Sequence, residues 1–203
     1  IDNYRDFALY FQDEDNILGT SFMPYLQNVA GLTGVNYRLE PWSYREDEGC
    51  ELGNMFTACV AADSDPATPT IKAHAGDNIM INVFGAHNEQ NQMFNVDGHQ
   101  WRRHLNQENS DMIDVEEFGG GEYIQAFFNA GGTYKNPGTY LWLDARTPYQ
   151  QAGQWGYLKV LPAGDRSILP LGKATVKGVK TASQPDEEEK SASKTGDDKL
   201  SMR

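Results

Sequence analysis

Two stretches decide the fold: IKAHAGDNIMINVFGAHNEQNQMFNVDGHQW at residues 71–101 and GTYLWLDARTPYQQAGQWGYLKVL at residues 138–161. In both, β-branched and aromatic residues alternate with polar ones, as Ile79, Ile81 and Val83 illustrate. Such alternation is typical of strands that bury one face and expose the other. Glycine-containing turns interrupt the runs before they are long enough for a helix. The two stretches therefore predict several short strands.

The same pattern of short strand candidates separated by turns continues through residues 68–162. The strand candidates are TPTIKAH (68–74), NIMINVFGA (78–86), MFNVDGHQW (93–101), DMIDVEEF (111–118), GEYIQAFFN (121–129), GTYLWLDA (138–145) and GQWGYLKVL (153–161). Seven short strands with no good helix predict an antiparallel sandwich or barrel. Residues 1–12 add one more strand, and residues 13–67 form a long irregular N-terminal excursion. Asp144 falls where the alternation of its strand calls for a core residue.

Composition narrows the class of protein. The chain has 203 residues, of which 39% are hydrophobic and 11% aromatic, so it is not wholly disordered. No apolar run approaches the length of about 18 residues that a membrane helix needs. Seventeen basic and 29 acidic residues give a net charge of -12. Because such a surface repels phosphate, we expect no nucleic-acid partner, and the lack of a long apolar run predicts no membrane span.

The chain divides into a folded body and a tail. We expect a single domain over residues 1–162 and a mixed-charge tail over residues 163–203, because apolar content falls sharply after SILPL. The tail is predicted to be flexible or to be ordered by a partner. The first residue is Ile1 rather than Met, so we expect a processed chain or a piece of a longer one.

The two cysteines, Cys50 and Cys59, lie nine positions apart in a polar segment. A local disulfide between them would suit an exported protein, so we predict an extracellular or periplasmic location. Two unpaired thiols in a cytosolic chain are the alternative. Two cysteines alone do not make a structural zinc site.

Three segments carry a resemblance to a known family. The opening DFALYFQDED (6–15) with GVNYRLEPW (34–42), the stretch 71–101 and the final hairpin 138–161 occur in the order seen in multicopper oxidases. The chain resembles a cupredoxin domain of the ceruloplasmin-like ferroxidases and bacterial manganese oxidases. The resemblance implies a cupredoxin-like, antiparallel Greek-key β-sandwich.

The resemblance also locates the family's copper ligands, and none of them is present. Blue copper needs a cysteine thiolate, two imidazoles and a weak axial ligand such as Met. At the matching positions Asp144 replaces the thiolate, Gln92 and Tyr149 replace the imidazoles, and Gln154 replaces the axial ligand. The two histidines that would serve a trinuclear cluster are replaced by Asn95 and Asp97. We therefore expect no copper cofactor in this chain, although copper in partner domains is compatible with the resemblance.

Two weaker metal sites remain open from the residues. Gln92, Asn95, Asp97 and Asp144 offer oxygen donors that suit calcium or manganese, or they bond to one another and to water. His87, Glu89, His99 and His104 offer a mixed set without the close spacing of a ligand pair, and scattered structural histidines are the favoured alternative. We expect His74 to be a surface residue at the end of a strand.

Three functions follow as hypotheses. In the first, the chain is a copper-free structural or interaction subunit of an exported redox assembly, and its partners are other cupredoxin domains or subunits of a larger complex. In the second, it is the non-copper domain of an active multicopper oxidase for Fe(II) or Mn(II), with an acidic cluster attracting the metal substrate. That cluster is Asp111, Asp114, Glu116 and Glu117. In the third, it is an oxygen-ligand metal-binding module. We do not expect catalysis by the chain alone; any activity would be of the multicopper-oxidase type and would come from other domains.

Overall fold

The structure is a computed structural model that describes residues 3–13, 33–56, 65–88 and 90–172, apart from the side chain of His87. These residues all fall within one compact unit, Ile1–Lys173. The elements in chain order are β1 (Arg5–Asp13), β2 (Gly34–Val35), α1 (Trp42–Asp47), the 3-10 helix η1 (Leu52–Asn54), β3 (Ile71–His74), β4 (Asn78–Asn88), β5 (Gln92–Val96), β6 (Trp101–Arg102), β7 (Met112–Ile113), β8 (Val115–Phe118), β9 (Tyr123–Asn129), β10 (Gly138–Asp144), α2 (Thr147–Ala152) and β11 (Trp155–Leu161).

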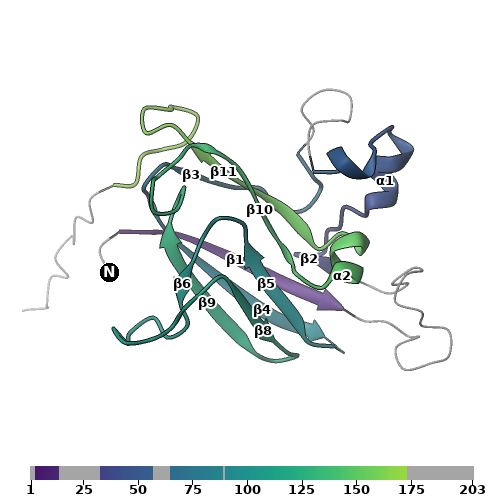
Figure 1. Cartoon of the computed structure of the whole chain (residues 1–203), viewed down its shortest axis with the longest axis horizontal. Helices are drawn as coiled ribbons and strands as arrows, with labels where there is room; N and C mark the ends of the chain where they lie inside the picture. Colours follow the sequence, from purple (N-terminus) through teal and green to yellow (C-terminus); the bar gives the residue numbers. More distant parts are fainter. Residues whose placement is uncertain (1–2, 14–32, 57–64, 89, 173–203) are drawn as a thin grey trace, which may run out of the picture. The chain divides into compact units, whose positions relative to one another are not determined.

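The strands form two main sheets, which confirms the prediction of a β-sandwich (Figure 1). One sheet has the order β2-β1-β4-β9 and the other the order β3-β11-β10-β5-β8, and β6 pairs with β7 separately. Most pairs are antiparallel as predicted, but β1 with β4 and β3 with β11 are parallel. In both parallel pairs the strands are far enough apart in sequence for the long connection that parallel pairing needs.

The core lies where the inward faces of the two sheets meet. Phe11 of β1 contacts the rings of Phe94, Phe118 and Trp142, all from the other sheet, in edge-to-face arrangements. All four side chains are buried. Edge-to-face aromatic pairs add to the free energy gained from burying their area. The alternation in the sequence therefore produces an aromatic core that fixes the two sheets against each other.

The segment between β10 and β11 contains a helix that the sequence analysis did not predict. Helix α2 begins with a proline in its first turn and ends at Gly153, whose φ of 114° favours glycine. Just beyond it, Gly156 packs so closely on the indole of Trp142 that an added Cβ would lie 2.3 Å from its nearest ring atom. The glycine lets the indole of Trp142 fit against β11.

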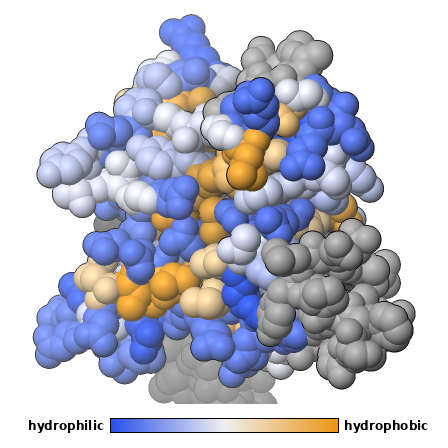
Figure 2. Space-filling model, turned by 45° about the vertical axis from the view of Figure 1, so that its right-hand side comes forward, coloured by the Kyte–Doolittle hydropathy of each residue, from blue (hydrophilic) through white to orange (hydrophobic). Residues whose placement is uncertain are grey.

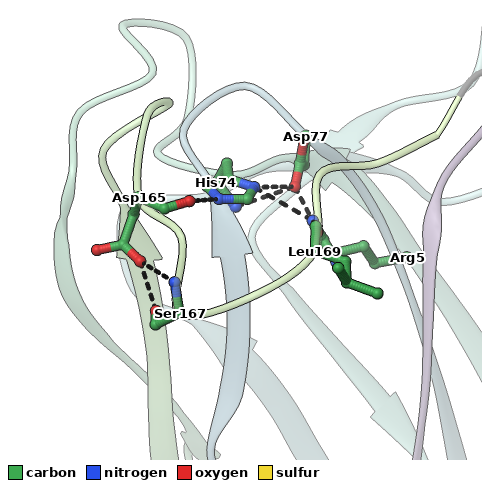
Figure 3. Close-up of polar contacts among 6 residues, drawn as sticks. All are labelled: Arg5, His74, Asp77, Asp165, Ser167 and Leu169. Carbon is green, nitrogen blue, oxygen red and sulfur yellow. Dashed lines mark hydrogen bonds and ion pairs between the residues drawn. The ribbon is translucent and has the colours of Figure 1, made fainter.

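His74 ties both ends of the described body to the turn between β3 and β4 (Figure 3). Its Nδ1 lies 3.2 Å from Nη2 of Arg5, and its Nε2 lies 2.8 Å from the carbonyl oxygen of Asp165. Arg5 also pairs with Asp77 at 2.6 Å and donates to the carbonyl oxygen of Leu169 at 2.6 Å. The prediction of a surface histidine is wrong, because these groups bury the ring to 5% exposure.

Asp165 and Leu169 belong to the tail that we predicted for residues 163–203. The part of that tail from residue 173 onward lies outside the described residues.

On the face shown in Figure 2, apolar side chains form small groups separated by hydrophilic ones, as the charge of -12 leads one to expect. Among the described residues, no helix is long and apolar enough to cross a membrane.

Candidate functional site

Five buried polar side chains gather at one end of the sandwich, and we call them the oxygen cluster. Each is exposed by 1% or less, and they come from five places in the chain. They are Asp13 at the end of β1, Gln92 at the start of β5, Asp144 at the end of β10, Tyr149 on α2 and Gln154 just before β11. In Figure 1, the ends of β1 and β10 and helix α2 lie on the same side of the body. Buried polar groups in such number mark a place where the core is interrupted.

Strand alternation explains why these side chains point inward. Along β1, Asp13 has the same parity as the buried Leu9 and Phe11. Along β5, Gln92 has the same parity as the buried Phe94 and Val96. Successive residues of a strand face opposite sides of the sheet, so each polar residue extends the row of core residues by one position.

Hydrogen bonds hold the cluster together. Gln92 Nε2 donates to Oδ2 of Asp13 at 3.4 Å, and Gln154 Nε2 donates to the carbonyl oxygen of Gln12 at 3.0 Å. The backbone N–H of Asp144 donates to the carbonyl oxygen of Gln154 at 2.9 Å, and that of Gln154 to the carbonyl oxygen of Tyr149 at 3.0 Å. The turn through α2 is thereby fixed against the end of β1.

Burial changes the titration of Asp144. Its Oδ1 accepts hydrogen bonds from the backbone N–H groups of Arg146 at 2.7 Å and Met93 at 3.3 Å. Loss of solvation raises the pKa of Asp144 from 3.8 to about 7, and the carboxylate of Asp13 contributes in the same direction. The two backbone bonds and the charge of Arg146 oppose the rise without cancelling it.

Tyr149 lies between the acidic side chains and Arg146. Burial raises its pKa, and the nearby carboxylate of Asp13 raises it further. The guanidinium of Arg146 stacks on the ring, 4.8 Å from the centroid. The same guanidinium donates to the carbonyl oxygen of Asn91 and to Oε1 of Gln90, the latter at 2.6 Å. Tyr149 therefore stays protonated, and Arg146 is held at the margin of the cluster by other partners.

Asn95 lies on the other face of β5, because its parity is opposite to that of Gln92, and Asp97 follows the last residue of that strand. Both line a pocket of about 830 Å³ together with Phe128 of β9. Asn95 donates to the carbonyl oxygen of Asp114 at 2.8 Å. Desolvation in the pocket raises the pKa of Asp97, an effect that the neighbouring His99 partly offsets. The six proposed copper positions therefore divide into a buried group of four and a pair that faces a pocket.

Comparison with solved structures identifies the fold. The crystal structure of a multi-copper oxidase from Pediococcus acidilactici aligns with 84% of the chain at a TM-score of 0.50 and 9% sequence identity. The chain has a cupredoxin-like fold. It spans 29% of the length of that oxidase.

Two further multicopper oxidases align over a similar share of this cupredoxin-like chain. The enzyme from Pseudomonas thermotolerans covers 77% of it at a TM-score of 0.46 and 9% identity, and the one from Campylobacter jejuni covers 78% at 0.45 and 12%. The chain spans 29% and 30% of their respective lengths. No family model matches the chain, and no curated protein matches its sequence.

The side chains of the oxygen cluster do not fit copper. Copper in such sites is bound by thiolate and imidazole, which are softer ligands than oxygen. The cluster offers two carboxylates, two amides and a phenol, and neither sulfur nor an imidazole. Among the residues that the structure describes, no three His, Cys, Asp or Glu side chains gather as metal ligands. The donor set is that of a hard-cation site or of a hydrogen-bonded network.

The second candidate set, from His87, Glu89, His99 and His104, is not assembled by the described part of the chain. The ring of His99 is buried, with Nε2 accepting from the backbone N–H of Gly131 at 3.0 Å and Nδ1 bonded to the carbonyl oxygen of Asp97 at 2.8 Å. Because both ring nitrogens are engaged, His99 is a structural histidine, and burial lowers its pKa. His104 is exposed, while Glu89 and the His87 side chain lie outside the described residues.

The predicted disulfide falls partly outside the described residues. Cys50 is buried at 6% exposure just after α1, whereas Cys59 belongs to the segment 57–64, which the structure does not describe. The pairing of Cys50 with Cys59 therefore stays a prediction.

Sequence reasoning missed Asp13 as a member of the oxygen cluster. The signal was present, because Phe7, Leu9 and Phe11 mark one face of β1 and Asp13 continues it at the same spacing. The residues opposite it across the sandwich were not visible from the sequence, since Gln92 is 79 positions away.

Proposed function

We propose that the chain is a copper-free cupredoxin-like domain that serves as a structural or interaction subunit of an exported assembly of the multicopper-oxidase kind. The observation that carries the proposal is the oxygen cluster. Four of the six positions that the resemblance assigns to copper ligands lie in it, their side chains are unsuited to copper, and both sheets are retained. Fold and function separate readily in this way. The isolated chain is accordingly without oxidase activity, and any copper resides in partner domains.

An aromatic row on the outer face of the β2-β1-β4-β9 sheet supports the interaction role. Tyr10, Phe84 and Tyr123 lie directly opposite one another on β1, β4 and β9. Their rings stack in sequence, with centroids 4.7 Å and 5.8 Å apart. Tyr10 is 44% exposed and Tyr123 is 59% exposed. Exposed tyrosines held rigidly on a sheet are typical of residues at the centre of protein interfaces.

The partner that we propose for the aromatic row is another cupredoxin domain, in the same assembly or the same polypeptide. The chain spans 29% of the length of the Pediococcus oxidase, which leaves most of that protein to other parts. An extracellular or periplasmic location and a disulfide between Cys50 and Cys59 belong to the same proposal, because disulfides persist in oxidising compartments.

Metal analysis and partner capture test the proposal together. The chain is purified from copper-supplemented cells, and bound copper is measured along with the visible absorption spectrum. We expect no stoichiometric copper and no intense absorption from a copper thiolate. Cross-linking in the native cells is expected to recover a protein with cupredoxin domains. The double variant Tyr10→Ser/Tyr123→Ser should lose that partner, whereas Tyr134→Ser, which alters a tyrosine that is 84% exposed elsewhere, should keep it.

Two results would overturn the proposal. One is thiolate-bound copper in this chain. The other is recovery of the same partners by the double variant and the unaltered protein.

The second candidate, a wall for an Fe(II) or Mn(II) oxidation site, receives less support. Two of its four carboxylates already have partners, because Glu117 accepts from Asn91 Nδ2 at 2.7 Å and Glu116 lies 3.5 Å from Nε1 of Trp101. Metal oxidation that depends on Asp111 and Asp114 in the full assembly would favour this candidate.

A further inference from the structure

The oxygen cluster contains more hydrogen-bond acceptors than its surroundings satisfy. Oε1 of Gln92, Oδ2 of Asp144 and Oε1 of Gln154 are buried and have no hydrogen-bond partner among the described residues. The amide nitrogens of both glutamines and the other oxygen of Asp144 are all bonded. The hydroxyl of Tyr149 also has no partner among the described residues, so one donor stands against three unpartnered acceptor oxygens. Buried oxygens without partners destabilise a fold unless a donor or a cation reaches them.

The charged groups within the cluster also favour a bound cation. The side chains of Asp13 and Asp144 are both fully buried, at 0% exposure. Arg146 is the cation that affects both Asp144 and Tyr149, but its guanidinium donates to Asn91 and Gln90 instead. A buried carboxylate such as that of Asp144 is stabilised by positive charge close by.

We propose that the oxygen cluster binds a hard divalent cation of the calcium type, with the carboxylates of Asp13 and Asp144 and the amide oxygens of Gln92 and Gln154 as its protein ligands. Calcium takes six to eight oxygen ligands from carboxylates, amides and water, so four protein oxygens leave room for water molecules. Mn²⁺ accepts the same kind of donors and supplies a spectroscopic probe.

Such a cation would act as a structural clamp. Its ligands come from β1, β5, β10 and the residue before β11, which belong to both sheets of the sandwich. Binding would therefore stabilise the end of the sandwich at which the core is interrupted. The inference goes beyond the interaction role, and neither depends on the other.

Two measurements on the full-length chain test the site after treatment with EDTA and removal of the chelator. In thermal melts, CaCl₂ at about one hundred times its dissociation constant should raise the midpoint by roughly 5–10 °C. In electron paramagnetic resonance, the signal of free aqueous Mn²⁺ should disappear when one equivalent of Mn²⁺ is bound by the protein. Excess Ca²⁺ should displace the bound Mn²⁺ and restore that signal.

Variants locate the binding. Gln154→Met keeps the length of the side chain but removes one oxygen, so the affinity for Mn²⁺ should fall about tenfold or more. Asp144→Asn should abolish the calcium shift. The matched control is Asp97→Asn, which neutralises a carboxylate that lines the separate pocket and should leave the shift unchanged.

The inference is overturned if neither Ca²⁺ nor Mn²⁺ binds at millimolar concentration, which would leave the cluster to water or a proton. It is also overturned if Gln154→Met binds Mn²⁺ as tightly as the unaltered chain, which would place the ion elsewhere. Because the Mn²⁺ signal is read on the native chain and on Gln154→Met, a folding defect in Asp144→Asn does not remove the test.

Discussion

Replacing Asp144 by Asn should make the protein more stable at alkaline pH while changing its stability little in acid. The carboxylate of Asp144 is buried and its pKa lies near 7, whereas the pKa of a solvent-exposed aspartate is 3.8. The folded chain therefore keeps a proton that the unfolded chain releases between about pH 4 and pH 7. The stabilising effect of that proton is present below pH 4 and is lost as the pH rises to 7.

The size of the effect follows from the same shift. About 3 pKa units at 1.36 kcal/mol each give an upper limit of about 4 kcal/mol. An asparagine cannot ionise, and its Oδ1 can accept the same bonds from the N–H groups of Arg146 and Met93. At pH 8 the Asp144→Asn variant should therefore exceed the unaltered chain by up to about 4 kcal/mol in its free energy of unfolding.

Urea denaturation in the presence of EDTA measures the difference. Solubility is lowest near the isoelectric point of about 4.7, so pH 5.5 and pH 8 are the practical limits. Across that window the advantage of the variant should grow by about 2 kcal/mol, because roughly 1.5 pH units lie below the pKa. The control Asp111→Asn removes an exposed carboxylate and measures how much of the result comes from losing one negative charge alone. A constant difference for Asp144→Asn, or a variant less stable at pH 8, would refute the reasoning.

Three further results are expected. Phe11→Ala should reduce the free energy of unfolding by about 3–5 kcal/mol in urea denaturation, because the ring is buried between the sheets; a loss below 1 kcal/mol would contradict this packing. Deleting residues 163–203 should lower stability by about 1–3 kcal/mol in the same assay, whereas deleting residues 173–203 should not, since the carbonyls that bond to Arg5 and His74 come before residue 173; equal effects would contradict this. Mass spectrometry of the protein purified without reductant should find a peptide that joins Cys50 to Cys59, and free thiols at both positions would exclude the disulfide.

The strands could be predicted because their signals are local. Alternation and glycine turns placed β4, β9, β10 and β11 within a few residues of their observed bounds. The parallel pairing of β1 with β4 could not be predicted, because no local pattern tells a strand which distant strand it will join. Helix α2 was missed for a related reason: six residues carry too little periodicity to distinguish a helical turn from a loop.

The candidate site could be predicted in part. Asp144 was recognised as a polar residue in a core position, and it is fully buried. Gln92 and Asp144 lie in the oxygen cluster, whereas Asn95 and Asp97, which were grouped with them, line a separate pocket. The parity of β5 separates Asn95 from Gln92. The burial of His74 also depended on Arg5 and Asp165, which are distant in sequence, and this dependence makes it invisible to local analysis.

The contacts of Arg5 have a mechanical consequence. The guanidinium of Arg5 donates hydrogen bonds to Asp77, in the turn between β3 and β4, and to the carbonyl oxygen of Leu169, which is distant in sequence and follows the last strand. A force that separates the first strand from the final described residues would load these few bonds before any ladder between strands is sheared. Under such a force, residues 163–172 should therefore detach first, while the aromatic core between the two sheets stays packed.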